Sequence, residues 1–250
     1  MRAAGRTGST DLDAVADLLW RAGDERADDG RVRLSARLIV EAAVTIADAE
    51  GLDALSMQRV ASVLGYTSMA LYRHVPGKDQ LVAAMTDVAT GRPPAPASPP
   101  PSWRAEIESW VDAVWEVYLR HPWLVRVPTN SAPVGPNELA WLEALLGPLS
   151  RAGLDRAELI PMATFISGAV RGLARAATEL DPAAAAAYGQ VLARHVDPGR
   201  FPVLSSLMAE DGLVEDDGGD LTPSVHHGMN RLLDGIEALR DRRSTQRKGT

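Results

Sequence analysis

Residues 56–81 read SMQRVASVLGYTSMALYRHVPGKDQL. Ser56 is suited to cap the N-terminus of a short helix, and Gly65 ends that helix just before Thr67 can cap the next one. The proline and glycine at 76–77 then stop the second helix. Two short helices on either side of a tight glycine turn are the layout of a helix-turn-helix. The segment therefore predicts such a motif, with its second helix beginning at Thr67.

Further helices are expected on both sides of this motif. After Ser35, apolar residues repeat with helical spacing until Gly51, and another amphipathic helix follows position 77. Residues 91–102, GRPPAPASPPPS, contain six prolines, which cannot continue a helix and favour extended backbone. We therefore expect a small helical domain over residues 31–90 and a semi-rigid linker after it.

The remainder of the chain also has helical spacing, and no stretch shows a sustained period of two. The expected fold class is all-α, with an N-terminal three-helix helix-turn-helix DNA-binding domain and a larger C-terminal helical domain over residues 103–241. Residues 1–30 are expected to form an extension with a short helix on a flexible arm. Residues 242–250 are expected to be a basic, solvated tail.

Local signals set some of the helix ends in the larger domain. Asn137 is expected to cap one helix, and Asp155 with Glu158 resembles a capping box that opens the next. Pro161 follows soon after this box and cannot donate a backbone hydrogen bond. Either that helix starts later than Asp155 or it kinks at the proline.

The composition is that of a folded protein, with 46% hydrophobic and 24% charged residues among 250. There are no cysteines, which excludes disulfides, thiolate metal sites and thiol-based redox sensing. The N-terminus lacks the apolar region of a signal peptide, and no stretch approaches the roughly 18 apolar residues of a membrane helix. We therefore expect a cytoplasmic protein with no membrane partner.

No group of residues points to catalysis, a metal or a cofactor. The sequence offers no nucleophile with a plausible base, no Gly-rich phosphate loop and no carboxylate pair at ligand spacing. His226 and His227 are adjacent and point in different directions on a helix, while His121 and His195 are isolated. We expect no catalytic residue, no metal and no cofactor.

The charge balance does not decide whether the chain binds nucleic acid. The formal net charge of −7 argues against it, because Lys and Arg supply most non-specific affinity for phosphate. Residues 31–90, however, hold six basic and six acidic side chains. Charge therefore neither supports nor excludes DNA binding by this segment.

Residues 34–85 resemble the N-terminal domain of the TetR/AcrR family of transcription regulators. The diagnostic cluster is GYTSMALYRHVPGKDQL at 65–81, because the cap, the turn, the aromatic residue and the lysine occur together at fixed spacing. The resemblance implies a homodimeric, ligand-responsive regulator, in most cases a repressor, whose partners are double-stranded DNA and a small-molecule effector. A hydrophobic or amphipathic effector is expected.

Four residues are expected to read bases. A helix that begins at Thr67 is short enough to lie in a major groove, which brings Thr67, Ser68 and Met69 of its first turn closest to base edges. Gln58 matches a family position that often reaches a base, and glutamine can bind adenine through two hydrogen bonds. Gln58 is the strongest single candidate for direct readout.

Four more residues are expected to hold the DNA backbone. The resemblance assigns phosphate contacts to Tyr72, His74 and Lys78, and Lys78 also lies in the first turn of a helix, whose free N–H groups suit an anion. Arg33 precedes the first helix of the domain and is placed to reach the backbone or a minor groove. Taken alone, Tyr72 would more often be a core residue than a DNA contact.

The larger domain offers two sets of candidates whose ordinary interpretation is structural. Apolar side chains that can line an effector pocket, or simply fill the core, are Trp110, Trp115, Tyr118, Trp123, Trp141, Met162 and Phe165. Small or apolar residues on late helices, which form the dimer interface in this family but can equally pack within one chain, are Gly168, Gly172, Val225, Met229, Leu232 and Ile236.

Two alternatives remain open at this point. The first is an enzyme with an incidental helix-turn-helix, which the lack of catalytic groups disfavours. The second is a DNA-binding protein without a ligand. A cavity of several hundred Å³ in the larger domain would distinguish a ligand-responsive protein from this second alternative, because periodicity alone cannot separate a pocket from a core.

Overall fold

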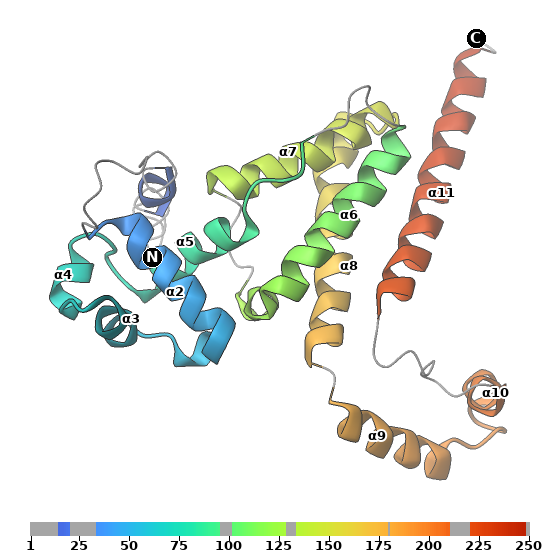
Figure 1. Cartoon of the computed structure of the whole chain (residues 1–250). Helices are drawn as coiled ribbons and strands as arrows, with labels where there is room; N and C mark the ends of the chain where they lie inside the picture. Colours follow the sequence, from blue (N-terminus) through green and yellow to red (C-terminus); the bar gives the residue numbers. More distant parts are fainter. Residues whose placement is uncertain are drawn as a thin grey trace, which may run out of the picture.

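The computed structural model of the chain describes residues 15–20, 34–95, 102–128, 134–179, 181–210 and 221–248. Every regular element in these ranges is a helix, which confirms the all-α fold class. The N-terminal group comprises α2 (Ala36–Glu50), the 3₁₀ turn η1 (Leu52–Ala54), α3 (Met57–Leu64), α4 (Ser68–Tyr72) and α5 (Lys78–Thr90). In Figure 1 this group forms one end of the molecule.

The helices of the N-terminal group pack around buried side chains that continue into the core of the C-terminal group. Helix α2 packs against α3 and α5, and α4 packs against α3. Each helix contributes at least one fully buried side chain, namely Ile39, Val60, Leu71 and Leu81. Burial of a side chain of this size stabilises the fold by roughly 1.5–3 kcal/mol. Helix α4 is therefore held against α3 by Leu71, its fully buried side chain.

The C-terminal group comprises α6 (Trp103–Arg120), the 3₁₀ turn η2 (Pro122–Arg126), α7 (Pro136–Arg151), α8 (Arg156–Glu179), α9 (Pro182–His195), α10 (Pro202–Glu210) and α11 (Thr222–Lys248). Helices α6, α7 and α8 pack against one another, and α11 packs on α6 and α8. In Figure 1, α9 and α10 extend from the end of α8 away from the N-terminal group.

Two helix ends differ from the expectation, and a third decides between two alternatives. Gly135, not Asn137, is the N-cap of α7, and the Glu138 carboxylate accepts from its backbone N–H. Helix α8 begins at Arg156 and continues through Pro161, so it does not start later. Helix α11 runs on to Lys248 instead of ending in a solvated tail at 242.

The extended end of α11 has a partner in the same chain. Arg243 forms two 2.9 Å hydrogen bonds with the Glu158 carboxylate in the first turn of α8. The same carboxylate accepts from the Asp155 backbone N–H at 2.7 Å, as the expected capping box requires. The pKa of Glu158 is lowered, first by its bond to Arg243. This contact explains why the basic residues after 241 continue the helix.

The extension before residue 34 includes a helical segment at 15–20 that is not a free arm. Leu18 and Leu19 are buried in the core, at 7% and 3% exposure. The Trp20 indole N–H donates to the carbonyl of Val134, just before α7, at 3.1 Å. The segment therefore packs where the two helical groups meet. Leu12, the third apolar residue of the expected stripe, lies outside the described residues.

A buried carboxylate joins the two groups. Asp87, in the last turn of α5, is 2% exposed. Its Oδ1 accepts from the backbone N–H groups of Asn137 and Glu138, each at 2.9 Å, and its Oδ2 accepts from the Asn137 side chain at 2.9 Å. The first turn of a helix leaves such N–H groups without a partner. Asp87 therefore caps α7 from a different helix.

A second junction between the two groups lies at the C-terminal end of α2. Asp48 Oδ1 is 2.8 Å from His121 Nδ1 and accepts from the Trp123 indole N–H at 2.7 Å. Nearby, Arg126 forms ion pairs with Asp53 and with Glu179. The helix-turn-helix group is thus fixed to the C-terminal group at both α5 and α2.

Candidate DNA-binding surface and ligand pocket

Side-chain caps define the helix-turn-helix. Ser56 Oγ accepts from the backbone N–H of Arg59 at 3.1 Å, and Thr67 Oγ1 accepts from that of Ala70 at 3.3 Å. Between them Gly65 ends α3 with φ +73° and ψ 26°, the left-handed conformation. The Tyr66 N–H bonds back to the Ala61 carbonyl at 2.9 Å and closes the turn. The two short helices and the glycine turn stand where the sequence places them.

Gly65→Ala is expected to lower the free energy of unfolding by about 1 kcal/mol, because a side chain disfavours left-handed backbone. No atom lies within 4 Å of the added Cβ, so the cost is confined to the backbone. Urea unfolding measures it. Gly189→Ala on α9 is the control, since it also meets open space but lies in ordinary helical backbone and is expected to stabilise. Equal changes in unfolding free energy for the two substitutions would contradict the role of left-handed backbone at Gly65.

The outer face of α4 carries large exposed side chains, and the adjacent helix α3 carries an exposed amide. Met69 is 71% exposed and Tyr72 45% exposed, whereas Leu71 between them is fully buried. Tyr72 is therefore not the core residue that its type alone would suggest. Gln58 is exposed in the first turn of α3, and its amide has no partner in the described part of the chain. Exposed apolar bulk next to a free amide suits a surface that contacts another molecule.

The remaining DNA-contact candidates lie on the same small group of helices. Thr67 and His74 are exposed at either end of α4, Ser68 is half-buried in its first turn, and Lys78 is exposed at the start of α5. The Thr67 hydroxyl accepts one backbone bond as a cap, which leaves its O–H free to donate. Arg33 lies outside the described residues. These placements are compatible with DNA contact.

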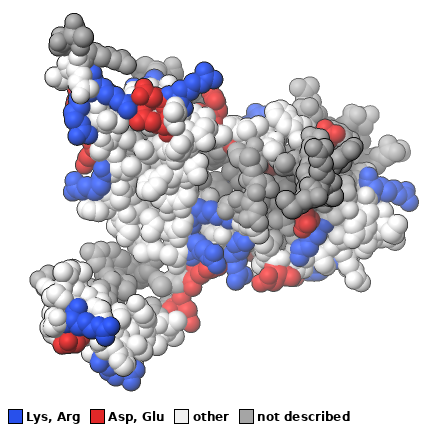
Figure 2. Space-filling view, turned by 180° about the vertical axis from the view of Figure 1, so that it is seen from behind, with Lys and Arg blue, Asp and Glu red and all other residues white. Residues whose placement is uncertain are grey.

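Basic side chains are scattered and do not form one broad patch on the face drawn in Figure 2, where Lys and Arg alternate with Asp and Glu. Within the helix-turn-helix, Arg59 is paired with Glu50, and Arg37 with Glu41.

Tryptophan N–H groups account for much of the hydrogen bonding around the predicted pocket. The Trp110 indole donates to the Trp141 carbonyl at 2.9 Å, and the two rings meet edge to face at 5.7 Å. Trp141 in turn donates to the Gly91 carbonyl at 2.9 Å. The Trp115 N–H is buried and has no partner among the described residues. Trp110 and Trp115 thus pack in the core between helices.

The other members of the predicted pocket set are divided. Met162 is half-buried against the core. Tyr118 is half-buried beside Arg171; burial raises the pKa of its phenol, and Arg171 opposes the rise. Phe165 is 61% exposed on the outer face of α8, so its assignment to an internal pocket was wrong. Phe165 was included because it is aromatic, whereas the inner face of α8 is formed by Ala163, Ile166 and Val170.

The predicted dimer residues also divide. Val225, Met229 and Ile236 are 3–5% exposed and belong to the core of their own chain, so they were wrongly assigned to a dimer surface. Leu232 is half-buried against the same core. Gly168 and Gly172 are instead exposed, and a Cβ added to either would meet no atom within 4 Å. Of the predicted dimer residues, these two glycines are the ones that lie open to another molecule.

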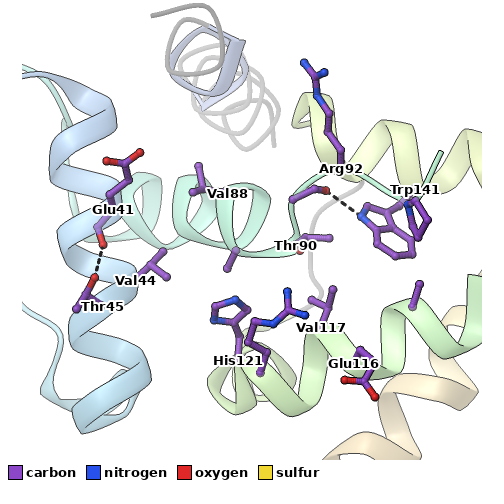
Figure 3. A pocket seen from close by; sticks show the side chains of 15 residues that line it. Glu41, Val44, Thr45, Val88, Thr90, Arg92, Glu116, Val117, His121 and Trp141 are labelled. Atoms are coloured by element: carbon purple, nitrogen blue, oxygen red, sulfur yellow. Dashed lines mark hydrogen bonds between the residues drawn. The ribbon is translucent and has the colours of Figure 1, made fainter. Parts of the chain in front are cut away.

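An open pocket of about 640 Å³ lies between the two helical groups, where α2 and α5 face α6 and α7 (Figure 3). Trp141 contributes to its lining, and Trp123 lines a second depression of about 550 Å³ beside Asp48. The sequence had suggested a pocket within the C-terminal domain alone. The described space is shared between the two groups, because its lining comes from α2 and α5 on one side and from α6 and α7 on the other.

The functional residues that sequence reasoning missed are the acids at these junctions. Burial raises the pKa of Asp87, although the N–H bonds from Glu138 and Asn137 oppose the rise. Burial also raises the pKa of Glu138; the Gly135 N–H opposes this, and the negative charge of Asp87 adds to it. The available signal for Asp87 was a single carboxylate on the apolar face of α5. Nothing local marked Asp48 as a partner of His121.

Two further observations concern the described residues. Among them no group of three or more His, Cys, Asp or Glu side chains is arranged to hold a metal ion. No helix within the same ranges has the length and apolar character needed to cross a membrane.

Comparison with known proteins defines the class. The profile of bacterial regulatory proteins of the tetR family matches residues 39–85, and that of tetracyclin repressor-like C-terminal domains matches residues 95–240. The second match alone covers more than half of the chain. The chain belongs to the tetR family and is a DNA-binding transcription regulator of the helix-turn-helix type.

Individual relatives agree with this class. The HTH-type transcriptional repressor DrrR1 of Streptomyces coeruleorubidus is 35% identical over 248 residues, which take in 93% of this chain and 88% of the relative. An HTH-type transcriptional regulator of Saccharopolyspora erythraea is 30% identical and covers 80% of this chain and 83% of its own. Apo ActR of Streptomyces coelicolor superposes with a TM-score of 0.73 at 25% identity, covering 85% of this chain and 99% of its own. ActR has also been solved in complex with (S)-DNPA, with a TM-score of 0.70, 25% identity and coverage of 83% and 98%.

Proposed function

We propose that this regulator is a homodimeric repressor that binds a pseudo-palindromic operator and releases it when a small amphipathic molecule binds. The observation that carries the proposal is the capped helix α4, which presents exposed Met69 and Tyr72 and packs on α3, the helix with the free amide of Gln58. Residues 31–90 would serve as the DNA-binding unit and residues 103–241 as the ligand-binding and dimerisation unit. Recognition helices of a dimer enter successive major grooves about 34–36 Å apart.

Helices α8 and α11 pack side by side. Their outer faces support dimerisation. Gly168 and Gly172 on α8, and Gly228 and Gly235 on α11, all meet open space where a side chain would stand. Small residues allow close approach of another helix. Phe165 lies exposed on the same side of α8 as the glycines and would be covered by a second copy.

Ligand response is supported by the relative ActR, which has been solved with (S)-DNPA bound. In this chain, a change in the C-terminal group can reach α4 through two junctions, Asp87 with α7 and Asp48 with His121. A ligand that favours one arrangement of these junctions would shift the dimer toward a spacing that no longer fits the operator.

Selection of random duplex DNA on the purified protein tests the proposal. We expect enrichment of a palindrome, with footprints on both half-sites and a dimer by light scattering. Enrichment of a single half-site bound by a monomer would contradict the dimer. No enrichment above non-specific binding would contradict sequence-specific DNA recognition.

Lys78→Ala is expected to weaken binding by a similar factor on operator and non-operator DNA, because a phosphate contact carries little sequence information. The plot of the logarithm of the association constant against the logarithm of salt concentration has a negative slope. Its magnitude should decrease by about 0.9 for each subunit that loses a phosphate contact. Fluorescence anisotropy at several salt concentrations measures both effects. Arg194→Ala on α9 removes the same charge far from α4 and should change neither; a Lys78→Ala effect confined to the operator would contradict the phosphate role.

A further inference from the structure

The pocket between the two helical groups has an apolar wall and a polar rim. Apolar side chains from three helices form the wall: Val44, Val88, Ala113 and Val117. At the rim, Arg120 and Glu116 are exposed and have no ion-pair partner among the described residues. The volume of about 640 Å³ is within the range of sites that hold a small organic molecule.

One rim residue has a fixed orientation and an unused polar atom. The His121 ring stands at the space between α6 and α5 in Figure 3, and its side chain is 13% exposed. Its Nδ1 lies 2.8 Å from Asp48 Oδ1. Because an ionised carboxylate only accepts hydrogen bonds, Nδ1 carries the proton in this pair. No described residue bonds to Nε2, which therefore remains for a molecule in the pocket.

We propose that this pocket binds a small amphipathic molecule through a weakly acidic hydroxyl group, such as a phenol, bonded to His121 Nε2. When the imidazole is neutral, Nε2 accepts a hydrogen bond from the hydroxyl group. When it is an imidazolium, Nε2–H donates a hydrogen bond to the deprotonated oxygen. His121 therefore accommodates either form of the hydroxyl; the Arg120 charge favours the anion, and the Glu116 charge at the same rim opposes it. The hydrocarbon part of the molecule packs against the valine side chains of the wall.

Occupancy of this pocket is coupled to the helix-turn-helix. The wall includes Val44 of α2 and Val88 of α5, both in the DNA-binding group, while His121 follows α6. A hydroxyl bonded to His121 also changes the strength of the His121 bond to Asp48, the α2 residue that holds this junction. By linkage, the molecule and the operator weaken each other's binding by the same factor. This coupling rests on the proposed function, whereas binding in the pocket does not.

The binding test uses two probes that differ only at the oxygen, 2-naphthol and 2-methoxynaphthalene, titrated calorimetrically into the full chain without DNA. We expect 2-naphthol to bind about three- to tenfold more tightly, the worth of one hydrogen bond. His121→Phe should abolish that preference, and the control His195→Phe on α9 should retain it. Equal affinities for the two probes, or a preference that survives His121→Phe, would overturn the inference.

A second variant keeps the test independent of the folding of His121→Phe. Val88→Trp narrows the pocket from the α5 wall and should reduce the affinity for both probes. Unchanged affinity in this variant would place the probes elsewhere and overturn the inference. With the selected operator present, saturating 2-naphthol should raise the dissociation constant for DNA; bound 2-naphthol without that effect would overturn the coupling. Failure to select any operator would contradict the proposed function while leaving the binding result intact.

Discussion

Asp87→Ala is expected to lower the free energy of unfolding by about 2–4 kcal/mol. The change removes the acceptor for two backbone N–H groups and one side-chain amide of α7. Each buried donor left without a partner costs about 1–3 kcal/mol. Water that enters the space left by the carboxylate offsets part of the total cost for the three donors. Burial raises the pKa of Asp87 despite these N–H bonds, so removing the buried charge offsets a further part of the loss.

Urea unfolding of Asp87→Ala and Asp87→Asn provides the measurement. Asparagine retains an oxygen that accepts from the backbone N–H groups. Its NH₂ group, however, faces the NH₂ donor of Asn137, so an intermediate loss of unfolding free energy is expected. Asp79→Ala, at an exposed position of the same helix, should cost no more than about 0.5 kcal/mol. A loss for Asp87→Ala as small as that for Asp79→Ala would show that Asp87 does not hold α7.

Gly135 offers an independent check on this junction. A side chain added there would lie 2.1 Å from Asp87 Oδ1, so alanine must displace the carboxylate from the α7 N-terminus. Gly135→Ala should therefore destabilise the wild type but have much less effect in the Asp87→Ala background. Additive losses would indicate that the two positions are not coupled.

The sequence predicted the features that depend on neighbours along the chain. Caps at Ser35, Ser56 and Thr67 each involve an N–H three residues on, so composition and spacing suffice to find them. The cap of α7 comes from Asp87 on another helix, and no local pattern contains that information. Asn137 looked like a cap because its side chain suits one, yet it donates to Asp87 instead.

Helical periodicity also identified apolar faces without identifying what covers them. The stripe of Val225, Met229 and Ile236 on α11 was found correctly, but the structure buries it against its own chain. Phe165 was placed inside by type, although α8 already has Ala163, Ile166 and Val170 on its inner face. Assigning a stripe to a core, a pocket or an interface requires tertiary contacts, which a single sequence does not contain.

Gln58→Ala is expected to weaken operator binding by roughly 10- to 100-fold for each half-site, the worth of a two-bond contact to a base. The side chain is exposed in the first turn of α3, next to α4, and has no partner among the described residues whose loss would disturb the fold. The unfolding midpoint in urea should therefore remain unchanged. Affinity for non-operator DNA should remain unchanged as well, because the amide carries no charge.

Anisotropy titrations on the selected palindrome and on a scrambled duplex separate a base contact from a general loss. A matched change, Gln190→Ala on α9, removes the same side chain far from α4 and should leave both affinities unaltered. A second selection with Gln58→Ala should show relaxed preference at one symmetric pair of positions, because only the base pair read by the amide loses its contact. An equal loss on both duplexes, with the preferred sequence unchanged, would instead assign Gln58 to the DNA backbone and leave base readout to Ser68 and Met69 of α4.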